Sequence, residues 1–337
     1  CNKGSLYRFT GDLKSALAYY EKSLCHKQNY SFAKFNKSIC ELAMANFKDG
    51  WKNYEYRECK YDEEVFLVDK PSLNTNILIL SEQGIGDVIM FSSVLQIFTD
   101  FKNLNFILDR RLIEIFSNSF PSINFKSQEN FDGNFINFSK IRIGSIPQFY
   151  LNSLEDFQKI SRPFLKSDNI KYKQVKKYIK KNKKNIGVYW SSSSKQPGKI
   201  VHIPLINILK KINLDDKNII SIQDGDIGKE LEYTSSILDY PITKIKSFDL
   251  RNDLNHLAAL ISECDLIISI SSTVIHLAGA LGTPTIVLSQ FADDWRYFQN
   301  KDTLIWYSFT HVLKQKKLDD WSYPLDCLNE KIDKILN

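Results

Sequence analysis

The feature that most constrains the fold is a strand-like run in the last third of the chain that passes directly into a helix-like run. Leu266–Ile270 is apolar and rich in β-branched residues, which is typical of a buried strand. Three small hydroxyl residues follow, and an apolar helical pattern then ends at Gly282-Thr283-Pro284. This order predicts a strand, a tight turn and a helix, the unit from which α/β proteins are built.

The turn between this strand and this helix also predicts an anion site. The first turn of a helix has unpaired backbone N–H groups and the positive end of the helix dipole, and Ser271, Ser272 and Thr273 add hydroxyl groups there. A diphosphate would fit such a site. The alternative is that Ser271 or Ser272 only caps the helix, because serine is a preferred N-cap residue. The segment by itself leaves both interpretations open.

Length and composition indicate a soluble protein of two or three domains. The chain has 337 residues, of which 43% are hydrophobic and 25% are charged. No apolar run approaches the roughly 18 residues that span a bilayer, and no leader-like segment occurs at the start. We therefore expect no transmembrane segment and a cytoplasmic location. The chain begins at Cys1 and not at Met, so we expect an upstream segment.

The six cysteines and the net charge exclude several classes of protein. The cysteines form no CxxC pair and have no histidine at metal-ligand spacing, so neither a zinc site nor a disulfide framework is expected. Eight lysines between residues 171 and 184 contribute much of the net charge of +6. Such a run is typical of a solvated helix face or a linker, and we expect no nucleic-acid partner.

Residues 1–60 show an internal repeat. Residues 11–22 align with residues 45–56 at an offset of 34, which is the tetratricopeptide period. Small residues at the paired positions Ala16 and Gly50 would let two helices approach, and Leu17 and Trp51 would fill the contact. We expect a helical tetratricopeptide segment, with the number of upstream repeats open. The alternative is an isolated helical hairpin that packs on the next domain.

The rest of the chain alternates strands and helices and predicts two doubly wound Rossmann-like α/β domains, at residues 61–170 and 171–337. We expect them to face one another across a cleft, with ligands at the carboxyl ends of the strands. The expected elements of the first domain are strands at 76–81, 104–108 and 135–138 and helices at 88–98 and 112–117. The second domain has expected strands at 185–190, 218–222, 242–246, 266–270 and 285–288.

A glycine loop follows the first expected strand. Gly84 and Gly86 would allow a tight turn and a close approach of a substrate to the backbone. The dinucleotide fingerprint needs a third glycine where Ile89 stands, so a dehydrogenase is disfavoured although Asp109 mimics the ribose-binding acid. Asp87 is placed either to accept a proton from an acceptor hydroxyl or to cap the following helix, and the sequence leaves both roles open.

Six motifs in order resemble those of bacterial tetratricopeptide proteins whose C-terminal part is similar to glycosyltransferase family 9, the heptosyltransferases, with the GT-B fold. The motifs are Glu82-Gln83-Gly84-Ile85-Gly86-Asp87, Gly144-Ser145-Ile146-Pro147, Ile186-Gly187-Val188-Tyr189-Trp190-Ser191, Ser221-Ile222-Gln223, His276-Leu277-Ala278-Gly279-Ala280-Leu281-Gly282 and Asp294-Trp295-Arg296-Tyr297. The resemblance covers essentially the whole chain.

This resemblance implies an inverting hexosyl- or heptosyltransferase that uses a nucleotide-sugar donor and needs neither metal nor cofactor. It implies that Asp87 is the base and that Lys195 balances charge on the leaving diphosphate. A packed histidine is the alternative for His276. The residues implied in donor binding are Gly84, Gly86, Trp190, Ser191, Ser192, Lys195, Gln223, Ser271, Ser272, Thr273 and His276.

Two departures from the family pattern bear on catalysis. Ser271-Ser272 stands where the family usually has Asp-Thr, and His256 stands where an upstream Asp is usual. These changes imply either a different donor or a protein that binds without catalysis. The expected acceptor is a protein, peptide or glycan hydroxyl, with a protein partner in the tetratricopeptide groove. The competing hypothesis is a non-catalytic scaffold with a vestigial transferase. Donor, acceptor and oligomeric state are left open.

Overall fold

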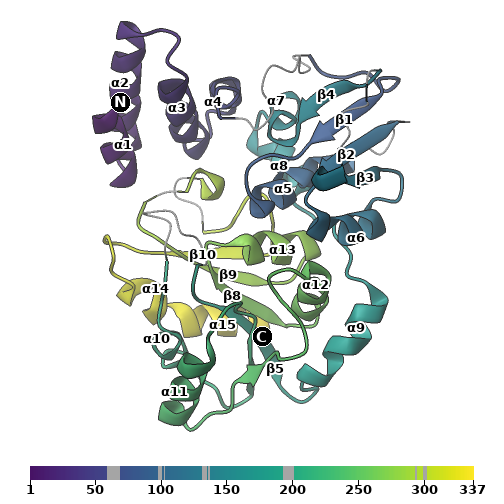
Figure 1. Cartoon of the computed structure of the whole chain (residues 1–337). Helices are drawn as coiled ribbons and strands as arrows, with labels where there is room; N and C mark the ends of the chain where they lie inside the picture. The colour runs from purple at the N-terminus through teal and green to yellow at the C-terminus, as the bar shows by residue number, and fades with distance from the viewer. Residues whose placement is uncertain are drawn as a thin grey trace. The chain divides into compact units, whose positions relative to one another are not determined.

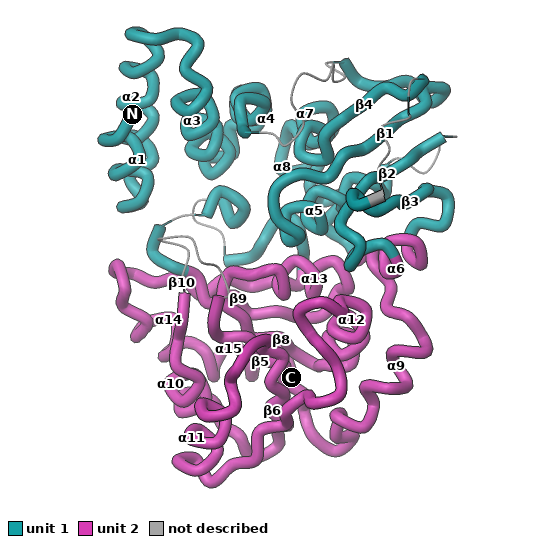
Figure 2. The backbone as a smooth tube through the Cα atoms, viewed as in Figure 1, with its two compact units in different colours: residues 1–113, 120–162, 290–308 teal, residues 114–119, 163–289, 309–337 magenta. Residues whose placement is uncertain are grey.

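A computed structural model describes residues 1–58, 69–97, 101, 103–130, 135, 137–192, 201–292, 294–298 and 302–337. The chain divides into two compact units (Figure 2). Unit 1 comprises residues 1–113, 120–162 and 290–308, and unit 2 comprises residues 114–119, 163–289 and 309–337. The domain boundaries expected at residues 60 and 170 stay predictions. Among the described residues, no helix has the length and apolar character needed to cross a membrane.

Unit 1 begins with a helical segment in which each helix packs on the next (Figure 1). Small residues permit the close packing, as expected. A Cβ atom added to Gly50 would lie 2.7 Å from a methyl group of Leu42, and one added to Gly4 would lie 2.8 Å from the Tyr20 ring. The residues of this segment therefore form packed helices, while their assignment as tetratricopeptide repeats stays a prediction. The helices are α1 (Asn2–Phe9), α2 (Leu13–His26), α3 (Ser31–Ala43) and α4 (Phe47–Tyr54).

The sheet of unit 1 is parallel and has the strand order β3-β2-β1-β4. Its strands are β1 (Ile77–Leu80), β2 (Leu104–Leu108), β3 (Asn124–Ser127) and β4 (Ser139–Arg142). The helices around it are α5 (Ile85–Phe91), η1 (Ser92–Ile97), α6 (Arg110–Ser119), η2 (Gln128–Asn130), η3 (Ile143–Ser145), α7 (Pro147–Tyr150) and α8 (Leu154–Ile160). The strand order reverses between β1 and β4, and such a switch point is where open α/β sheets bind ligands.

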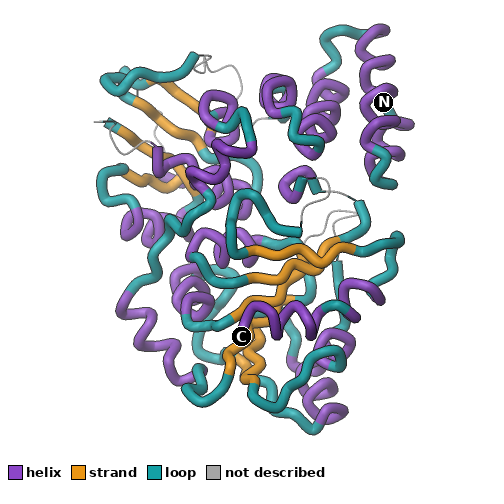
Figure 3. Tube along the Cα trace, turned by 180° about the vertical axis from the view of Figure 1, so that it is seen from behind, coloured by secondary structure: helices purple, strands orange, loops and turns teal. Residues whose placement is uncertain are grey.

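Unit 2 contains a six-stranded parallel sheet of order β10-β9-β8-β5-β6-β7 with its switch point between β5 and β8. Helices cover both faces: α12 and α13 lie in front of the sheet in Figure 1, and α15 lies in front of it in the reverse view of Figure 3. The strands are β5 (Lys184–Tyr189), β6 (Lys217–Ser221), β7 (Thr243–Lys244), β8 (Leu266–Ile270), β9 (Thr285–Ser289) and β10 (Thr310–Lys314). The helices are α9 (Asn169–Val175), η4 (Lys176–Tyr178), α10 (Leu205–Leu209), α11 (Gly228–Leu238), α12 (Leu254–Ser262), α13 (Thr273–Leu281), α14 (Ser322–Asp326) and α15 (Leu328–Leu336).

The strand, turn and helix expected around residue 270 are confirmed. β8 occupies the predicted residues, and α13 ends at Gly282, whose φ of +81° and contact with Pro163 favour a residue without a side chain. The helix expected at 88–98 is shorter, because α5 ends at Phe91 and continues as the 3-10 helix η1 to Ile97.

A strand was expected at residues 135–138. This prediction is wrong, because the strand in this region, β4, begins at Ser139. Phe135 instead joins the buried side chains of Leu78, Leu80 and Ile107, and its ring meets Phe138 edge-on at 5.1 Å. This aromatic run therefore fills the core beside the sheet. The true strand has only Ile141 buried, which hides it from a search for apolar runs.

The sequence analysis also missed β3 and β10. Both strands lie at the edge of a sheet, and both carry polar residues at most positions. An edge strand is covered on fewer sides than a central strand, so it needs fewer apolar residues. Its apolar pattern in the sequence is therefore weak.

Residues 290–308, here called the strap, follow β9 and belong to unit 1. The strap includes the 3-10 helix η5 (Trp295–Tyr297). Trp295 packs against Trp51 at 5.9 Å and Phe91 at 6.2 Å, and Trp306 meets Phe91 edge-on at 5.9 Å. Trp295 and Trp306 are thus core aromatics.

Candidate functional site

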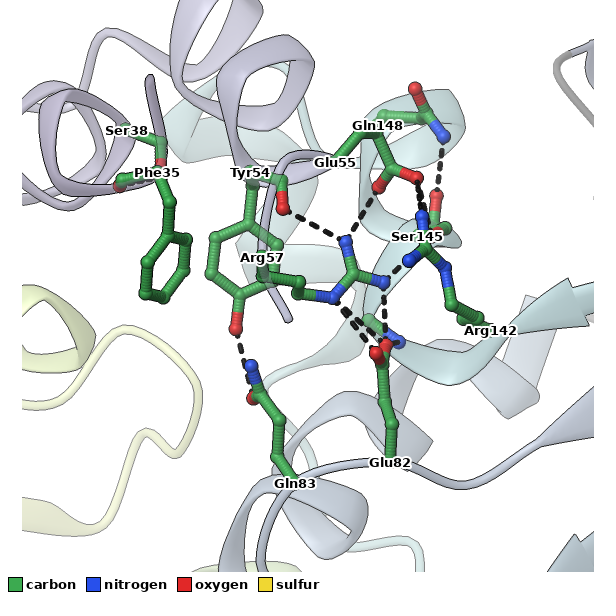
Figure 4. A network of polar contacts seen from close by, with 11 residues as sticks. Phe35, Ser38, Tyr54, Glu55, Arg57, Glu82, Gln83, Arg142, Ser145 and Gln148 are labelled. Carbon is green, nitrogen blue, oxygen red and sulfur yellow. Dashed lines mark hydrogen bonds and ion pairs between the residues drawn. The ribbon is translucent and has the colours of Figure 1, made fainter. Parts of the chain in front are cut away.

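The switch point of unit 1 is held by a buried ion pair. Arg57, which follows α4, donates from Nε to both oxygens of Glu82 at 3.0 and 2.9 Å and from Nη2 to the Ser145 hydroxyl at 2.8 Å (Figure 4). Glu82 follows β1 and Ser145 follows β4. Arg57 and Glu82 are only 4% and 2% exposed. One guanidinium therefore joins the helical segment to both loops at the carboxyl edge of the sheet.

Glu55 and Gly144 complete this network. Glu55 accepts hydrogen bonds from Arg57 at 2.9 Å, Arg142 at 2.7 Å and the Ser145 hydroxyl at 2.8 Å. The Gly144 N–H donates to Glu82 at 3.1 Å, and a Cβ atom on Gly144 would lie 2.8 Å from the same carboxylate oxygen. Burial opposes the charge on Arg57, but the carboxylates of Glu82 and Glu55 raise its pKa. The Arg57 guanidinium therefore keeps its charge in the folded protein.

The glycine loop takes its left-handed backbone at Gln83 and not at a glycine. Gln83 has a φ of +61°, whereas Gly84 has a φ of −89°. The expectation that the glycines would form the turn is thus wrong in this respect. The Tyr54 hydroxyl donates to the Gln83 side-chain oxygen at 2.9 Å (Figure 4). A left-handed non-glycine residue is strained, and such strain persists where surrounding contacts hold it.

Asp87 lies in the first turn of α5, and both of its carboxylate oxygens accept hydrogen bonds. One oxygen accepts the Gly84 N–H at 3.2 Å, so the capping role is confirmed. The other accepts Arg296 Nε at 3.0 Å and also Arg296 Nη2. Arg296 donates from Nη1 to Asp294 at 3.0 Å. Burial opposes the charge on Arg296, but Asp294 and Asp87 raise its pKa well above the usual value. The role of Asp87 as a base stays a prediction.

In unit 2, Gln223 braces the loop that follows β5. Its side-chain oxygen accepts the N–H groups of Trp190 at 3.0 Å and Ser191 at 2.9 Å, and its amide nitrogen donates to the Ser191 carbonyl at 2.9 Å. The Ser192 N–H donates to the Val201 carbonyl at 2.7 Å. Four of the residues expected to bind the nucleotide-sugar donor thus lie together at the carboxyl edge of the sheet. Lys195 lies outside the described residues.

The turn after β8 lies at the other side of the same switch point. Ser272 is the N-cap of α13, and its hydroxyl oxygen accepts the Val274 N–H at 3.2 Å. Ser271 and Thr273 flank it and are partly exposed, while His276 is buried one turn further on. The capping role expected for a serine is confirmed at Ser272. The anion-binding role of this helix start stays a prediction.

A pocket of about 130 Å³ lies beside the end of β6. It is smaller than the roughly 300–1,000 Å³ of a whole small-molecule site, so it fits part of a ligand. The Ser221 hydroxyl is buried at this pocket and, within the described part of the chain, has no hydrogen-bond partner. Asp224 accepts the Tyr189 hydroxyl at 2.8 Å. The lining residues include Ser221, Gln223, Asp224, Lys244, Phe248 and Asp249.

His256, noted as a departure from the family pattern, is a packed residue of α12. Its Nδ1 lies 2.5 Å from Asp253, and its Nε2 lies 2.5 Å from Gln174. Its ring stacks on Phe248 with the ring centres 3.9 Å apart. His256 therefore fixes the orientation of a side chain that lines the pocket.

Unit 2 thus brings together most of the expected donor residues, while Gly84, Gly86 and Asp87 lie in unit 1. No site role was predicted for Tyr54, Arg57, Ser221, Asp224, Phe248 or Arg296, because their contacts depend on how the chain packs. For Ser221 a signal existed, since it ends the fully buried strand β6. Among the described residues, no group of three or more His, Cys, Asp or Glu could hold a metal ion.

Comparison with known proteins gives a family match and two similar folds. The model of glycosyltransferase family 9 (heptosyltransferase) matches residues 250–320, which include β8, its turn and α13. A glycosyl transferase family 9 structure from Veillonella parvula has a TM-score of 0.53 at 12% identity, covering 80% of this chain and 99% of that one. The ADP-heptose LPS heptosyltransferase II of E. coli has a TM-score of 0.51 at 11% identity, covering 78% and 98%.

A curated relative is also similar in sequence. Protein FlbA of Caulobacter vibrioides is 24% identical over 316 residues, covering 85% of this chain and 53% of FlbA. The chain therefore spans about half the length of this relative. The family model matches one part of the chain, and the two solved structures share its α/β fold with parallel sheets. The tetratricopeptide assignment stays a prediction.

The buried pair at the switch point generates a stability prediction. Replacing Arg57 by Ala leaves Glu82 buried without its cation, so the free energy of unfolding of unit 1 should fall by about 3–5 kcal/mol. Urea unfolding followed by tryptophan fluorescence measures this loss. The Arg57→Met/Glu82→Met double variant should recover much of it, because no lone charge remains.

The exposed pair between Lys159 and Asp156, at 2.8 Å in the same unit, provides the control. Lys159→Ala should cost at most about 1 kcal/mol, as exposed pairs do. An equally small loss for Arg57→Ala would contradict a structural role for the buried pair.

Proposed function

We propose that the chain transfers a sugar from a nucleotide-sugar donor to a hydroxyl group of a protein, peptide or glycan. The observation that carries this proposal is the edge of the unit 2 sheet, where the turn before α13, the loop braced by Gln223 and the pocket at Ser221 adjoin one another along neighbouring strands. The turn also lies within the family match. The tetratricopeptide groove for a protein partner, the cytoplasmic location and the absence of a metal requirement belong to the same proposal.

Unit 2 would hold the nucleotide. The pocket beside β6 would take the base against Phe248, with the Ser221 hydroxyl as a hydrogen-bond partner. An acidic side chain after the second strand of such a sheet is placed to bind ribose hydroxyls, and Asp224 lies there. The diphosphate would meet the backbone N–H groups of the first turn of α13, at Thr273 and its neighbours.

The reaction would invert the anomeric centre. The acceptor oxygen attacks the anomeric carbon from the face opposite the diphosphate, and the bond from that carbon to the diphosphate oxygen breaks. Asp87 takes the acceptor proton, and the diphosphate leaves with the bonding electron pair. Donors at the start of α13 and Lys195 would stabilise the charge that develops on it.

A non-catalytic scaffold is the second candidate, and two observations favour it. Both carboxylate oxygens of Asp87 accept hydrogen bonds, one from Gly84 and one from Arg296, so an acceptor hydroxyl would have to share the carboxylate with these partners. Ser271 also stands where the family has an acid. A scaffold of this kind would retain the nucleotide pocket without turnover.

Nucleotide binding tests the donor site first. A thermal-shift titration with ADP, UDP, GDP and CMP should show one nucleotide that stabilises the protein, by about 2.7 kcal/mol at 100 times its dissociation constant. Ser221→Ala should weaken that nucleotide about 3- to 10-fold, the value of one hydrogen bond, without destabilising the free protein.

Thr234→Val is the matched control for Ser221→Ala. The Thr234 hydroxyl is also buried without a partner among the described residues, but it does not line the pocket. Its removal should leave nucleotide affinity unchanged. Equal affinities of the wild type and the Ser221→Ala variant would contradict this placement of the nucleotide.

The role of Asp87 is tested by Asp87→Asn. Asparagine still accepts the Gly84 N–H but takes up no proton, so transfer should fall about 10²- to 10⁴-fold while nucleotide affinity stays nearly constant. Asp294→Asn is the control, because it perturbs Arg296 from its other side without changing the Asp87 carboxylate. Transfer at wild-type rates by Asp87→Asn would place the base elsewhere.

A further inference from the structure

We propose that Tyr54 and Arg57, which belong to the helical segment, are positioning residues for the loop from Glu82 to Asp87. In this inference the helical segment is part of the acceptor-side machinery and not a separable adaptor. The inference rests on the proposed function for its catalytic meaning. Its physical content, the control of the loop by α4, can be measured without any substrate.

Two consecutive residues of the loop are each held by a side chain from the end of α4. Arg57 binds Glu82 through two nitrogens, and Tyr54 donates to Gln83 (Figure 4). Burial raises the pKa of the Tyr54 phenol, so the hydroxyl keeps its proton and acts as the donor. These contacts lie at the switch point, where the loop presents its backbone.

The backbone conformation of Gln83 also points to a need for such contacts. Its φ of +61° is a conformation that glutamine rarely adopts, and no glycine of this loop adopts it instead. A strained residue at a candidate site needs contacts that over-determine it. The Tyr54 hydroxyl donates to the Gln83 side chain, and Gly84 follows Gln83 directly as the N-cap of α5.

Helix α4 is itself held rigidly within unit 1. Trp51 donates from its indole nitrogen to the Leu151 carbonyl at 2.6 Å, and its ring packs on Phe91 of α5 at 6.5 Å. Tyr54 packs on Phe91 at 6.0 Å and on Trp295 at 5.5 Å. Tyr54 is 1% exposed, so its hydroxyl is aimed at the loop from a fixed position.

The position of Asp87 depends on this arrangement, because Asp87 follows Glu82 and Gln83 within one turn. Its carboxylate caps the loop at Gly84, and Arg296 of the strap binds its other oxygen. A change in the Gln83 backbone would move the Gly84 N–H that this carboxylate accepts. Tyr54 and Arg57 therefore act on the candidate base through the loop and do not contact it themselves.

Hydrogen exchange measured by mass spectrometry tests the inference directly. Tyr54→Phe keeps the ring in its aromatic contacts and removes only the hydroxyl. Amides in the peptide that spans residues 82–88 should then exchange about 3- to 10-fold faster, as expected for one lost hydrogen bond. Arg57→Lys keeps the positive charge but lacks the planar guanidinium that binds Glu82 through two nitrogens. It should therefore also speed exchange in this peptide.

Tyr20→Phe is the matched control. Tyr20 is fully buried in the same helical segment, and its hydroxyl donates to Ser5 at 3.2 Å, away from the loop. Its removal should leave exchange in residues 82–88 unchanged. In a Gln83→Gly background, Tyr54→Phe should have no further effect on the loop, because the acceptor of the bond is gone and glycine adopts positive φ freely.

The outcomes separate this inference from the proposed function. Faster loop exchange in Tyr54→Phe, with none in the control, supports positioning even if no donor is ever turned over. If a donor is found, Tyr54→Phe should lower kcat and leave the donor KM unchanged, because the residues proposed to hold the base and the diphosphate of the donor belong to unit 2. Loop exchange in Tyr54→Phe that equals the wild type overturns the inference, whatever the chain transfers.

Discussion

Unit 1 depends on the ion pair between Arg57 and Glu82. A carboxylate at the end of a fully buried strand is costly unless a cation and further donors satisfy it. Arg57 supplies the cation, and the Gly144 N–H supplies a further donor. Because the same guanidinium also binds Ser145, the loops after β1 and β4 share one partner. The geometry of the switch point is thereby tied to the helical segment.

The switch point of unit 2 is built from neutral groups. Hydroxyl residues form the turn before α13, and the Gln223 amide holds the N–H groups of Trp190 and Ser191 in the loop after β5. The pocket beside β6 adds an aromatic ring, a buried hydroxyl and an acid. In the proposed function, unit 1 would activate a hydroxyl and unit 2 would hold the leaving diphosphate at the start of α13.

The sequence predicted the central strands and the start of α13 well because their signals are local. β2 and β8 are fully buried, and Ser272 is a cap that its neighbours reveal. The edge strands β3 and β10 were missed, since a partly exposed strand needs few apolar residues. The pair between Arg57 and Glu82 was not predictable from periodicity, because its members are 25 residues apart and their partnership depends on how α4 packs.

The central claim is that the chain cleaves the bond between a sugar and a nucleotide. Proton NMR of a panel of nucleotide sugars, incubated with the chain and a mixture of acceptors, follows the anomeric proton of each donor. The account predicts that one donor is consumed, with release of its nucleotide and a product of inverted anomeric configuration. A donor that binds to the protein and persists unchanged would contradict it and favour the scaffold.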